Sequence, residues 1–504
     1  MAAELTKTAA GPSVRSLEGA VGARTAMVAT ACILGAAAVG VTAGELSLSG
    51  HAFAVVGVIW LAIPIVCWRL PAAGVFLMAG GALLIEEYPS IPGLKTITES
   101  IPLFKSLAVG VGLAGVAVNP AEILIATVAG TWVLKAVAEG DFSLPRSHVA
   151  AGVGLMLLAV LAGEAHGLAS GSNVTASLWE LRPWLYLACM YVVAAQLIKT
   201  PRLVLGVLWT LVIATGLKGL EGTIRWFGSS HITSPPEQIL GHEEALFMGL
   251  FILLTASLWL FRIKGRLRQV ATALLPLVVF ANLANSRRTA YVILGAGVAI
   301  LIAVAWAREP RRRWMTGGIA VALMAAMALY LPVFWNRSGL MAQPANAIRS
   351  AVDPTKRDAS SDLYRVIENA NLSIDIRAET PLGTGFGKQI ATPIHLVDIS
   401  NIDPFIVYEP HNTILYIWLR LGFPGAIAFW WLIGAATIAA CRLARFPDPL
   451  IALVGTFAVV AISAYLIEGW FDQGLVGLRI AIVLGAVLGT MEATRKLAAE
   501  RLTS

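Results

Sequence analysis

Long apolar runs, separated by short polar connections, are the dominant pattern of this chain. A membrane-spanning helix needs about 20 mostly apolar residues. About 14 runs approach this pattern, and they predict an all-α polytopic membrane protein with about 14 transmembrane helices. The runs lie at about 25–43, 52–68, 71–85, 121–138, 149–165, 182–198, 202–219, 243–262, 268–284, 289–307, 314–333, 411–436, 449–468 and 473–491.

The composition agrees with this pattern. Of the 504 residues, 57% are hydrophobic and only 13% are charged, against about 25% charged residues in ordinary soluble domains. A soluble protein of this size still needs a polar surface. The composition therefore excludes a soluble enzyme, a disordered chain and a coiled coil.

The positions of the basic residues orient the predicted helices. Short connections rich in arginine and lysine remain on the cytoplasmic side of a membrane, and an even number of spans places both termini there. The net charge of +7 thus reflects membrane orientation, and we expect no nucleic-acid partner. The cytoplasmic connections and tails contain Arg262, Lys264, Arg266 and Arg268; Arg308, Arg311, Arg312 and Arg313; Arg442 and Arg445; and the segments 1–24 and 493–504.

The same count divides the chain into regions. Residues 25–335 are expected to hold helices 1–11, residues 336–410 a large extracytoplasmic loop, and residues 411–492 helices 12–14. Residues 103–118 are apolar enough to span as well, but another span would reverse the parity. We therefore expect an outer interfacial segment near 86–120. The run at 25–43 resembles a signal peptide, yet so many spans follow that a retained first helix is favoured.

Two adjacent arginines, Arg287 and Arg288, stand between two apolar runs on the outer side, where positive charge should be scarce. Guanidinium groups stay charged and present a planar fork of donors to phosphate oxygens. The segment is therefore a candidate anion site. The alternative is that both side chains extend to lipid headgroups.

His411 lies in Tyr408-Glu-Pro-His-Asn412, where the long outer loop ends and the twelfth span begins. Pro410 suits the first turn of a helix, and the positive end of the helix dipole should keep the imidazole neutral. A neutral imidazole at the membrane surface can act as general base for a hydroxyl group. The alternative is a structural histidine bonded to the backbone.

Other outer-loop residues are weaker candidates. Arg365 and Arg377 lie in an amphipathic stretch near 362–377 and could line a pocket that faces the bilayer. Paired charges on a solvated helix face are the favoured explanation for Arg377 and an equal alternative for Arg365. A second outer loop, about 220–242, contains Arg225 and His242. His242 could bind a cation or an acceptor, although the acidic residues after it also suit a helix dipole.

Several patterns are weak or absent. The glycines in Pro381-Leu-Gly-Thr-Gly-Phe-Gly387 are better explained by turns than by a dinucleotide fingerprint, because no strand precedes them. The chain contains no Walker A motif and no HExxH. The four cysteines include no CxxC, which argues against a zinc site or a disulfide framework.

Taken together, these segments resemble the O-antigen ligase and polymerase superfamily of bacterial envelope glycosyltransferases. Ser286 through Tyr291 looks like the arginine motif of the family, and Leu363 through Gly387, with Arg365, looks like its large periplasmic loop. His411-Asn412 is followed by nine residues and then by Gly422-Phe-Pro-Gly425, which matches the ligase spacing. The close resemblance covers roughly 280–430.

The resemblance implies a reaction. Such enzymes transfer a glycan en bloc from an undecaprenyl-diphosphate donor to a sugar hydroxyl of a glycan or glycolipid acceptor. The transfer inverts the anomeric centre, requires no metal, cofactor or ATP, and occurs on the outer face of the bacterial inner membrane. His411 would be the base, Arg288 and Arg287 would bind the diphosphate, and Arg365 would assist at the donor site.

Three alternatives stay open. The first is a surface-polysaccharide polymerase, whose family pattern separates an arginine and a glycine by ten residues, whereas Arg377 and Gly387 are separated by nine. The second is a flippase or transporter, for which midplane charges are expected and Lys218 with Glu221 are the nearest instance. The third is a peptidoglycan-polymerising relative that uses an acidic loop residue, for example Asp398 or Asp403.

Overall fold

The structure is a computed structural model, and every regular element in the part of the chain that it describes is a helix. The described residues are 62–87, 98, 101, 103–106, 118–229, 238–379, 381–399, 405–474 and 476–503. The predicted all-α class is therefore confirmed for this part. The predicted span at 25–43, most of 52–68 and most of the segment near 86–120 lie outside the described residues.

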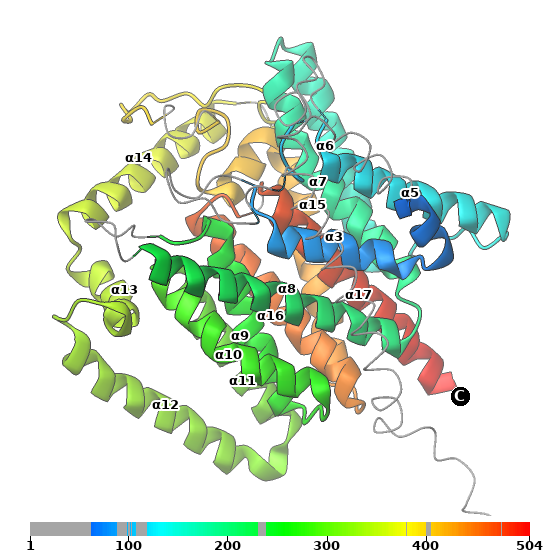
Figure 1. The fold of residues 1–504 in the computed structure, drawn as a ribbon. Coiled ribbons are helices and arrows are strands. Elements are labelled where there is room, and N and C mark those ends of the chain that lie inside the picture. Colours follow the sequence, from blue (N-terminus) through cyan, green and yellow to red (C-terminus); the bar gives the residue numbers. More distant parts are fainter. Residues whose placement is uncertain are drawn as a thin grey trace, which may run out of the picture.

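Most of the helices overlap a predicted apolar run, and Figure 1 shows their arrangement. They are α3 (Ala72–Leu84), α5 (Pro120–Ala138), α6 (His148–Ala169), α7 (Val174–Leu197), α8 (Pro201–Gly228), α9 (His242–Leu260), α10 (Arg266–Ala284), α11 (Arg288–Arg308), η3 (Pro310–Arg312), α12 (Arg313–Phe334), η4 (Leu340–Ala342), α13 (Gln343–Val352), α14 (Lys356–Ala378), α15 (Thr413–Ala444), α16 (Pro449–Phe471) and α17 (Leu478–Thr503).

Nine helices of the described part are long and apolar enough to cross a membrane. They are α5, α6, α8, α9, α10, α11, α12 with η3, α15 and α16. α3 has the same character but only 13 residues, whereas α7 and α17 carry charged residues such as Glu180 and Glu492. The total of about 14 spans therefore stays a prediction.

Several helices begin at a capping side chain followed by proline. The side chains of Asn119, Thr200 and Asp448 each accept a backbone hydrogen bond from the first turn that follows, at 2.9, 3.3 and 2.9 Å. Each is followed by a proline, whose missing N–H and fixed φ suit the first helical position. These local signals explain why α5, α8 and α16 begin within a residue of the predicted positions.

The helices pack as one bundle, from which α12 is largely separate. α14 lies on the side of the bundle far from the C-terminus, as expected if the two lie on opposite sides of a membrane (Figure 1). Of the residues of α12, only Thr316 is buried, and Leu329 is 75% exposed. An apolar helix with so little protein contact suits a lipid environment.

A fully buried ion pair joins α7 to α15. Arg420 Nε donates to Glu180 Oε1 at 2.8 Å, and neither side chain is more than 1% exposed. Tyr416 also donates to Glu180 Oε1, at 3.0 Å. Buried pairs of this kind gain little over apolar residues, but the loss of one partner is costly because it leaves an unpaired charge.

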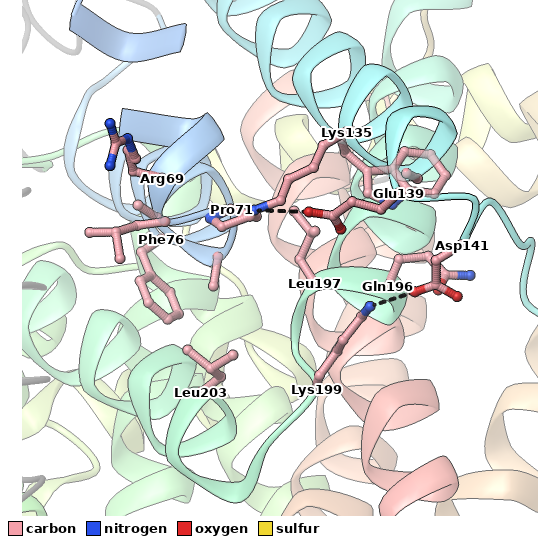
Figure 2. A pocket seen from close by; sticks show the side chains of 15 residues that line it. Arg69, Pro71, Phe76, Lys135, Glu139, Asp141, Gln196, Leu197, Lys199 and Leu203 are labelled. Carbon is pink, nitrogen blue, oxygen red and sulfur yellow. Dashed lines mark hydrogen bonds and ion pairs between the residues drawn. The ribbon is translucent and has the colours of Figure 1, made fainter. Parts of the chain in front are cut away.

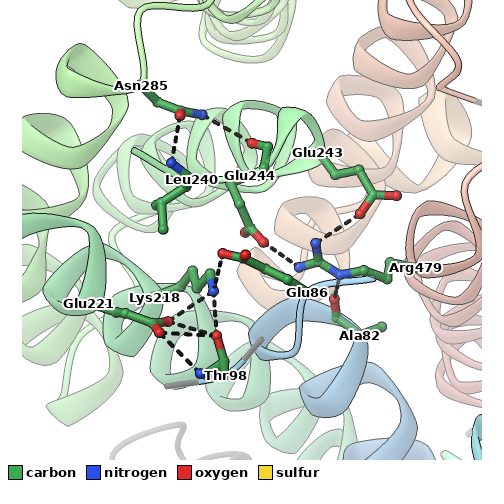
Figure 3. Close-up of polar contacts among 11 residues, drawn as sticks. Ala82, Glu86, Thr98, Lys218, Glu221, Leu240, Glu243, Glu244, Asn285 and Arg479 are labelled. Carbon is green, nitrogen blue, oxygen red and sulfur yellow. Dashed lines mark hydrogen bonds and ion pairs between the residues drawn. The ribbon is translucent and has the colours of Figure 1, made fainter. Parts of the chain in front are cut away.

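A second buried network connects α8, α9 and α17 (Figure 3). Lys218 Nζ lies 2.7 Å from Glu86 Oε1 and 2.9 Å from Glu221 Oε2. Arg479 contacts Glu243 Oε2 at 2.8 Å and Glu244 Oε1 at 2.6 Å. Lys218, which the sequence offered as the nearest instance of a midplane charge, is thus buried against carboxylates, and so are Arg420 and Arg479, which the sequence did not single out.

The glycine-rich segment 381–387 packs against the break in α15. Gly383, Gly385 and Gly387 have φ of +74° to +77°, a region that favours glycine, which confirms them as turn glycines. Thr384 N and Gly385 N donate to the carbonyls of Leu419 and Arg420 at 2.8 and 3.0 Å. α15 is interrupted here at Gly422, whose φ is +60°. The turn thus satisfies carbonyl groups that the break leaves free.

Replacing Arg420 by alanine should destabilise the protein strongly, because Glu180 would keep a buried charge with no cation. We expect a loss of about 3–5 kcal/mol, measured as a lower midpoint of thermal unfolding in detergent. Arg442→Ala, at the exposed end of the same helix, is the matched control and should change the midpoint little. Equal midpoints for the two variants would contradict the assignment.

Candidate functional site

The turn between α10 and α11 has a fixed, strained geometry. Ser286 has φ of +50°, an uncommon conformation for a residue with a side chain. Asn285 holds the segment before α9, because Leu240 N donates to its Oδ1 at 3.1 Å and its Nδ2 donates to the carbonyl of Gly241 at 3.2 Å (Figure 3). The turn therefore places Arg287 just before α11 and Arg288 in its first turn.

Arg287, Arg288 and Arg365 line one cavity of about 130 Å³ between this turn and α14. Nε of Arg287 and Nε of Arg365 are buried and have no hydrogen-bond partner within the described residues. The other guanidinium end of Arg287 donates to Gln238 Oε1 at 2.8 Å. Donors on cations that are buried without an acceptor are costly, and they suit an anionic ligand. The remaining lining residues are Gln238, Ser286, Thr289, Arg357, Asp358, Ser361 and Asp472.

Arg288 is already engaged by α14. Its two terminal nitrogens contact the two carboxylate oxygens of Asp362 at 2.7 and 3.1 Å, which is a bidentate pair. The side chain of Arg288 is nevertheless 31% exposed. Arg288 therefore ties α11 to α14 and still reaches the cavity.

His411 pairs with Glu368 of α14. Its Nδ1 lies 3.2 Å from both carboxylate oxygens, and its backbone N–H donates to Glu368 Oε2 at 3.1 Å. The ring of Tyr364 packs edge-on against the imidazole, with centroids 5.7 Å apart. Because a carboxylate only accepts, Nδ1 carries a hydrogen and Nε2 is the free ring nitrogen.

Two expectations for His411 need correction. α15 begins at Thr413 with Asn412 as its cap, so Pro410 lies before the helix and not in its first turn. The imidazole is also not kept neutral by the helix dipole. Burial lowers the pKa of His411, but the hydrogen bond and charge of Glu368 raise it more, and the pKa lies above its ordinary value of 6.5.

Asp472, directly after α16, links these groups. Its Oδ2 lies 3.4 Å from Nδ1 of His242. Burial raises the pKa of Asp472, but the bond and charge of His242, together with the charges of Arg287 and Arg365, hold it well below its usual range. Asp472 also contributes to the raised pKa of His411. His411 does not line the arginine cavity, but Asp472, whose charge acts on it, does.

The outcome differs for the remaining candidates. His242 contacts Asp472, which lines the arginine cavity. Arg225 is buried in the last turn of α8 and is not among the residues that line the cavity. Arg377 is exposed near the end of α14. Sequence reasoning missed Glu368 and Asp472 as partners of the histidines, and the only available signal was the position of Glu368 three residues after Arg365.

A cavity of about 500 Å³ at the opposite ends of the helices has a different character (Figure 2). It lies between the start of α3 and the ends of α5 and α7. Lys199 pairs with Asp141 at 3.2 Å, and Lys135 lies 3.9 Å from Glu139. The two lysines of this cavity thus each have a carboxylate partner. Over the residues that the structure describes, no group of three His, Cys, Asp or Glu could hold a metal ion.

The helix arrangement and the apolar spans define a multi-pass membrane protein. Residues 271–430 match the family model described as O-Antigen ligase, which confirms the resemblance to the O-antigen ligase superfamily over this region. The match includes Arg287, Arg288, Arg365 and His411, whereas Asp472 lies outside it. A search of curated proteins gives no match to the chain.

The pairing of His411 with Glu368 should make stability depend on pH. A raised pKa in the folded state gives stability that is fully present below about pH 6.5, the unfolded pKa, and is lost as pH rises through the folded pKa. We therefore expect Glu368→Gln to lower the unfolding midpoint most near pH 6 and progressively less toward pH 9. A midpoint difference that is constant over this range would contradict the pairing.

Proposed function

We propose that this protein is an inverting membrane glycosyltransferase that moves a glycan en bloc from an undecaprenyl-diphosphate donor to an acceptor sugar hydroxyl. The reaction would occur on the extracytoplasmic face of the bacterial inner membrane, with both termini in the cytoplasm. The observation that carries the proposal is the meeting of Arg287, Arg288 and Arg365 at one cavity, with His411 paired to Glu368 three residues along α14 from Arg365. The match to the O-antigen ligase family supports the same class.

The cavity suits the diphosphate. Two phosphates bring at least two negative charges, and the unpaired Nε donors of Arg287 and Arg365 offer charge-assisted hydrogen bonds to them. Their positive charge would stabilise the diphosphate as it leaves. Arg288 would share its free edge with the donor while Asp362 holds it in position.

His411 suits the acceptor. The acceptor oxygen would form a bond to the anomeric carbon, and its proton would pass to Nε2 of His411. The bond from the anomeric carbon to the phosphate oxygen would break, and its electron pair would leave with undecaprenyl diphosphate. Glu368 would fix the tautomer of the ring and stabilise the imidazolium.

The lipid tail needs an apolar surface beside the arginine cavity. In the proposed orientation the start of α11 would lie at the outer end of the bundle, and the neighbouring α12 is almost entirely uncovered. A polyprenyl chain could lie along α12 within the bilayer while its diphosphate reaches the arginines. This placement keeps the anionic centre at the membrane surface, where the cost of burying its charge is smaller.

Replacing His411 by alanine should reduce glycan transfer by roughly 10²–10⁴-fold, the usual contribution of a general base. The measurement is product formation by purified protein, given lipid-diphosphate glycan and candidate acceptors. His395→Ala is the matched control, because His395 is exposed and lies in the same segment between α14 and α15. Full activity of His411→Ala would overturn the role of His411, and products longer than one transferred unit would favour the polymerase alternative.

The pH profile gives the same prediction a second readout. The base must be neutral, so kcat/KM of the wild type should fall below a pKa that lies above 6.5, because Glu368 raises the pKa of His411. In Glu368→Gln this limb should move to lower pH, because burial of the ring then dominates. An unchanged limb would mean that another group is titrating.

Arg365→Ala should raise the KM for the donor about tenfold or more, since a charge-assisted hydrogen bond contributes about 1.5–3 kcal/mol. Arg377→Ala, three turns further along the same helix, should leave the KM unchanged.

Arg288→Ala should lose more activity than Asp362→Asn, although both break the same ion pair. Equal losses in that pair of variants would make Arg288 a purely structural residue.

A further inference from the structure

A second cavity, of about 330 Å³, borders the arginine cavity. The two share Gln238, Ser286, Arg288, Arg357 and Asp358. The part that belongs to the second cavity alone has no charged side chain. It is lined by Trp226, Tyr291, Gln343, Asn346, Ala347 and Ser350.

One face of α13 forms much of this wall. Gln343, Asn346, Ala347 and Ser350 recur at intervals of three and four residues, which places them on one side of a helix. Arg288 of the shared border donates to Ser350 Oγ at 3.4 Å. Charge is therefore confined to one end of the combined space, while neutral amides, hydroxyls and two aromatic rings surround the other.

Two polar atoms of the neutral part have no internal partner. The hydroxyl of Tyr291 and Oδ1 of Asn346 are buried, and neither has a hydrogen-bond partner among the residues that the structure describes. Such groups are rare in native structures and carry a cost of about 1–3 kcal/mol each. A ligand rich in hydroxyl groups would satisfy both, whereas a hydrocarbon chain would satisfy neither.

We propose that this neutral cavity binds the first sugars of the donor glycan, next to the diphosphate in the arginine cavity. The proposal rests on the proposed function and adds a glycan subsite to it. Trp226 and Tyr291 would pack on sugar rings, while Tyr291, Gln343 and Asn346 would bond their hydroxyls. A volume of about 330 Å³ is at the lower end of the roughly 300–1,000 Å³ of ligand sites, so only a short stretch of glycan enters.

The test compares two probes on purified protein in detergent: undecaprenyl diphosphate without sugar, and the undecaprenyl-diphosphate oligosaccharide from the cells that make this protein. Tyr291→Phe and Asn346→Ala should each weaken binding of the glycosylated lipid by roughly 2- to 12-fold, the loss of one neutral hydrogen bond. Neither should change binding of the sugar-free lipid. Tyr291→Phe should not lower the unfolding midpoint, because it removes a hydroxyl that has no partner in the free protein.

Tyr191→Phe is the matched control. Its hydroxyl is also buried, but it lies in α7 beside Ser147 and does not line this cavity. It should bind both lipids as the wild type does. The glycan subsite would be overturned if the two variants, Tyr291→Phe and Asn346→Ala, weakened the binding of both lipids equally, or if neither variant weakened the binding of either lipid. The diphosphate assignment would remain intact in both cases. A wild type that binds neither lipid would instead reject the proposed function.

Discussion

The buried pair between Arg420 and Glu180 is the contact through which the segment between α14 and α15 is fixed to the helix bundle. Arg420 also donates to Thr384 Oγ1 at 3.2 Å and to the carbonyl of Tyr408 at 2.8 Å, and Glu180 accepts from the backbone N–H of Gly387. One ion pair thus holds the glycine turn and the residues just before His411. Both charges are desolvated, so the pair is stable only while all these partners remain in place. The position of His411 therefore depends on contacts inside the helix bundle.

α14 provides a second set of contacts, which connects the arginines to His411. Asp362, Arg365 and Glu368 recur every three residues and therefore share one face of the helix. They reach Arg288, the arginine cavity and His411 in turn. One helix face thereby sets the separation between the proposed anion site and the proposed base. Asn371 continues this anchoring further along the helix, because it exchanges two hydrogen bonds with the backbone of Ile394.

The sequence predicts much of the helix layout because apolar length is a local property. α9, α11 and α16 begin at the predicted residues or within one of them. The start of α7 was wrong by eight residues, since Glu180 and Arg182 interrupt its apolar run. The residue that makes Glu180 tolerable, Arg420, lies 240 positions away, and no local pattern contains that information.

The candidate site shows the same division. Arg287, Arg288 and Arg365 were recognisable because they are cations at positions predicted to be on the outer side, where the charge pattern of the loops leads us to expect few. Glu368 and Asp472 look like ordinary acidic residues at a helix face and a helix end. Asp472 contacts His242 across 230 positions, and its importance follows only from the packing of α16 beside α9. Residues whose charge is unexpected at their place in the sequence could be recognised. Residues whose role depends on a partner far away in the sequence could not.

The isolation of α12 has a consequence for how the protein depends on its surroundings. Contacts fix this helix mainly near its two ends, where Gly317 lies under Trp306 and the hydroxyl of Tyr330 donates to the carbonyl of Met341. Between them, few protein contacts hold α12, so the match of hydrophobic lengths with a bilayer would influence its tilt. The distance between α12 and the arginines of α11 is therefore partly a function of membrane thickness. Activity measured in short-chain and in long-chain lipids would therefore compare the same protein with α12 at different distances from the arginines of α11.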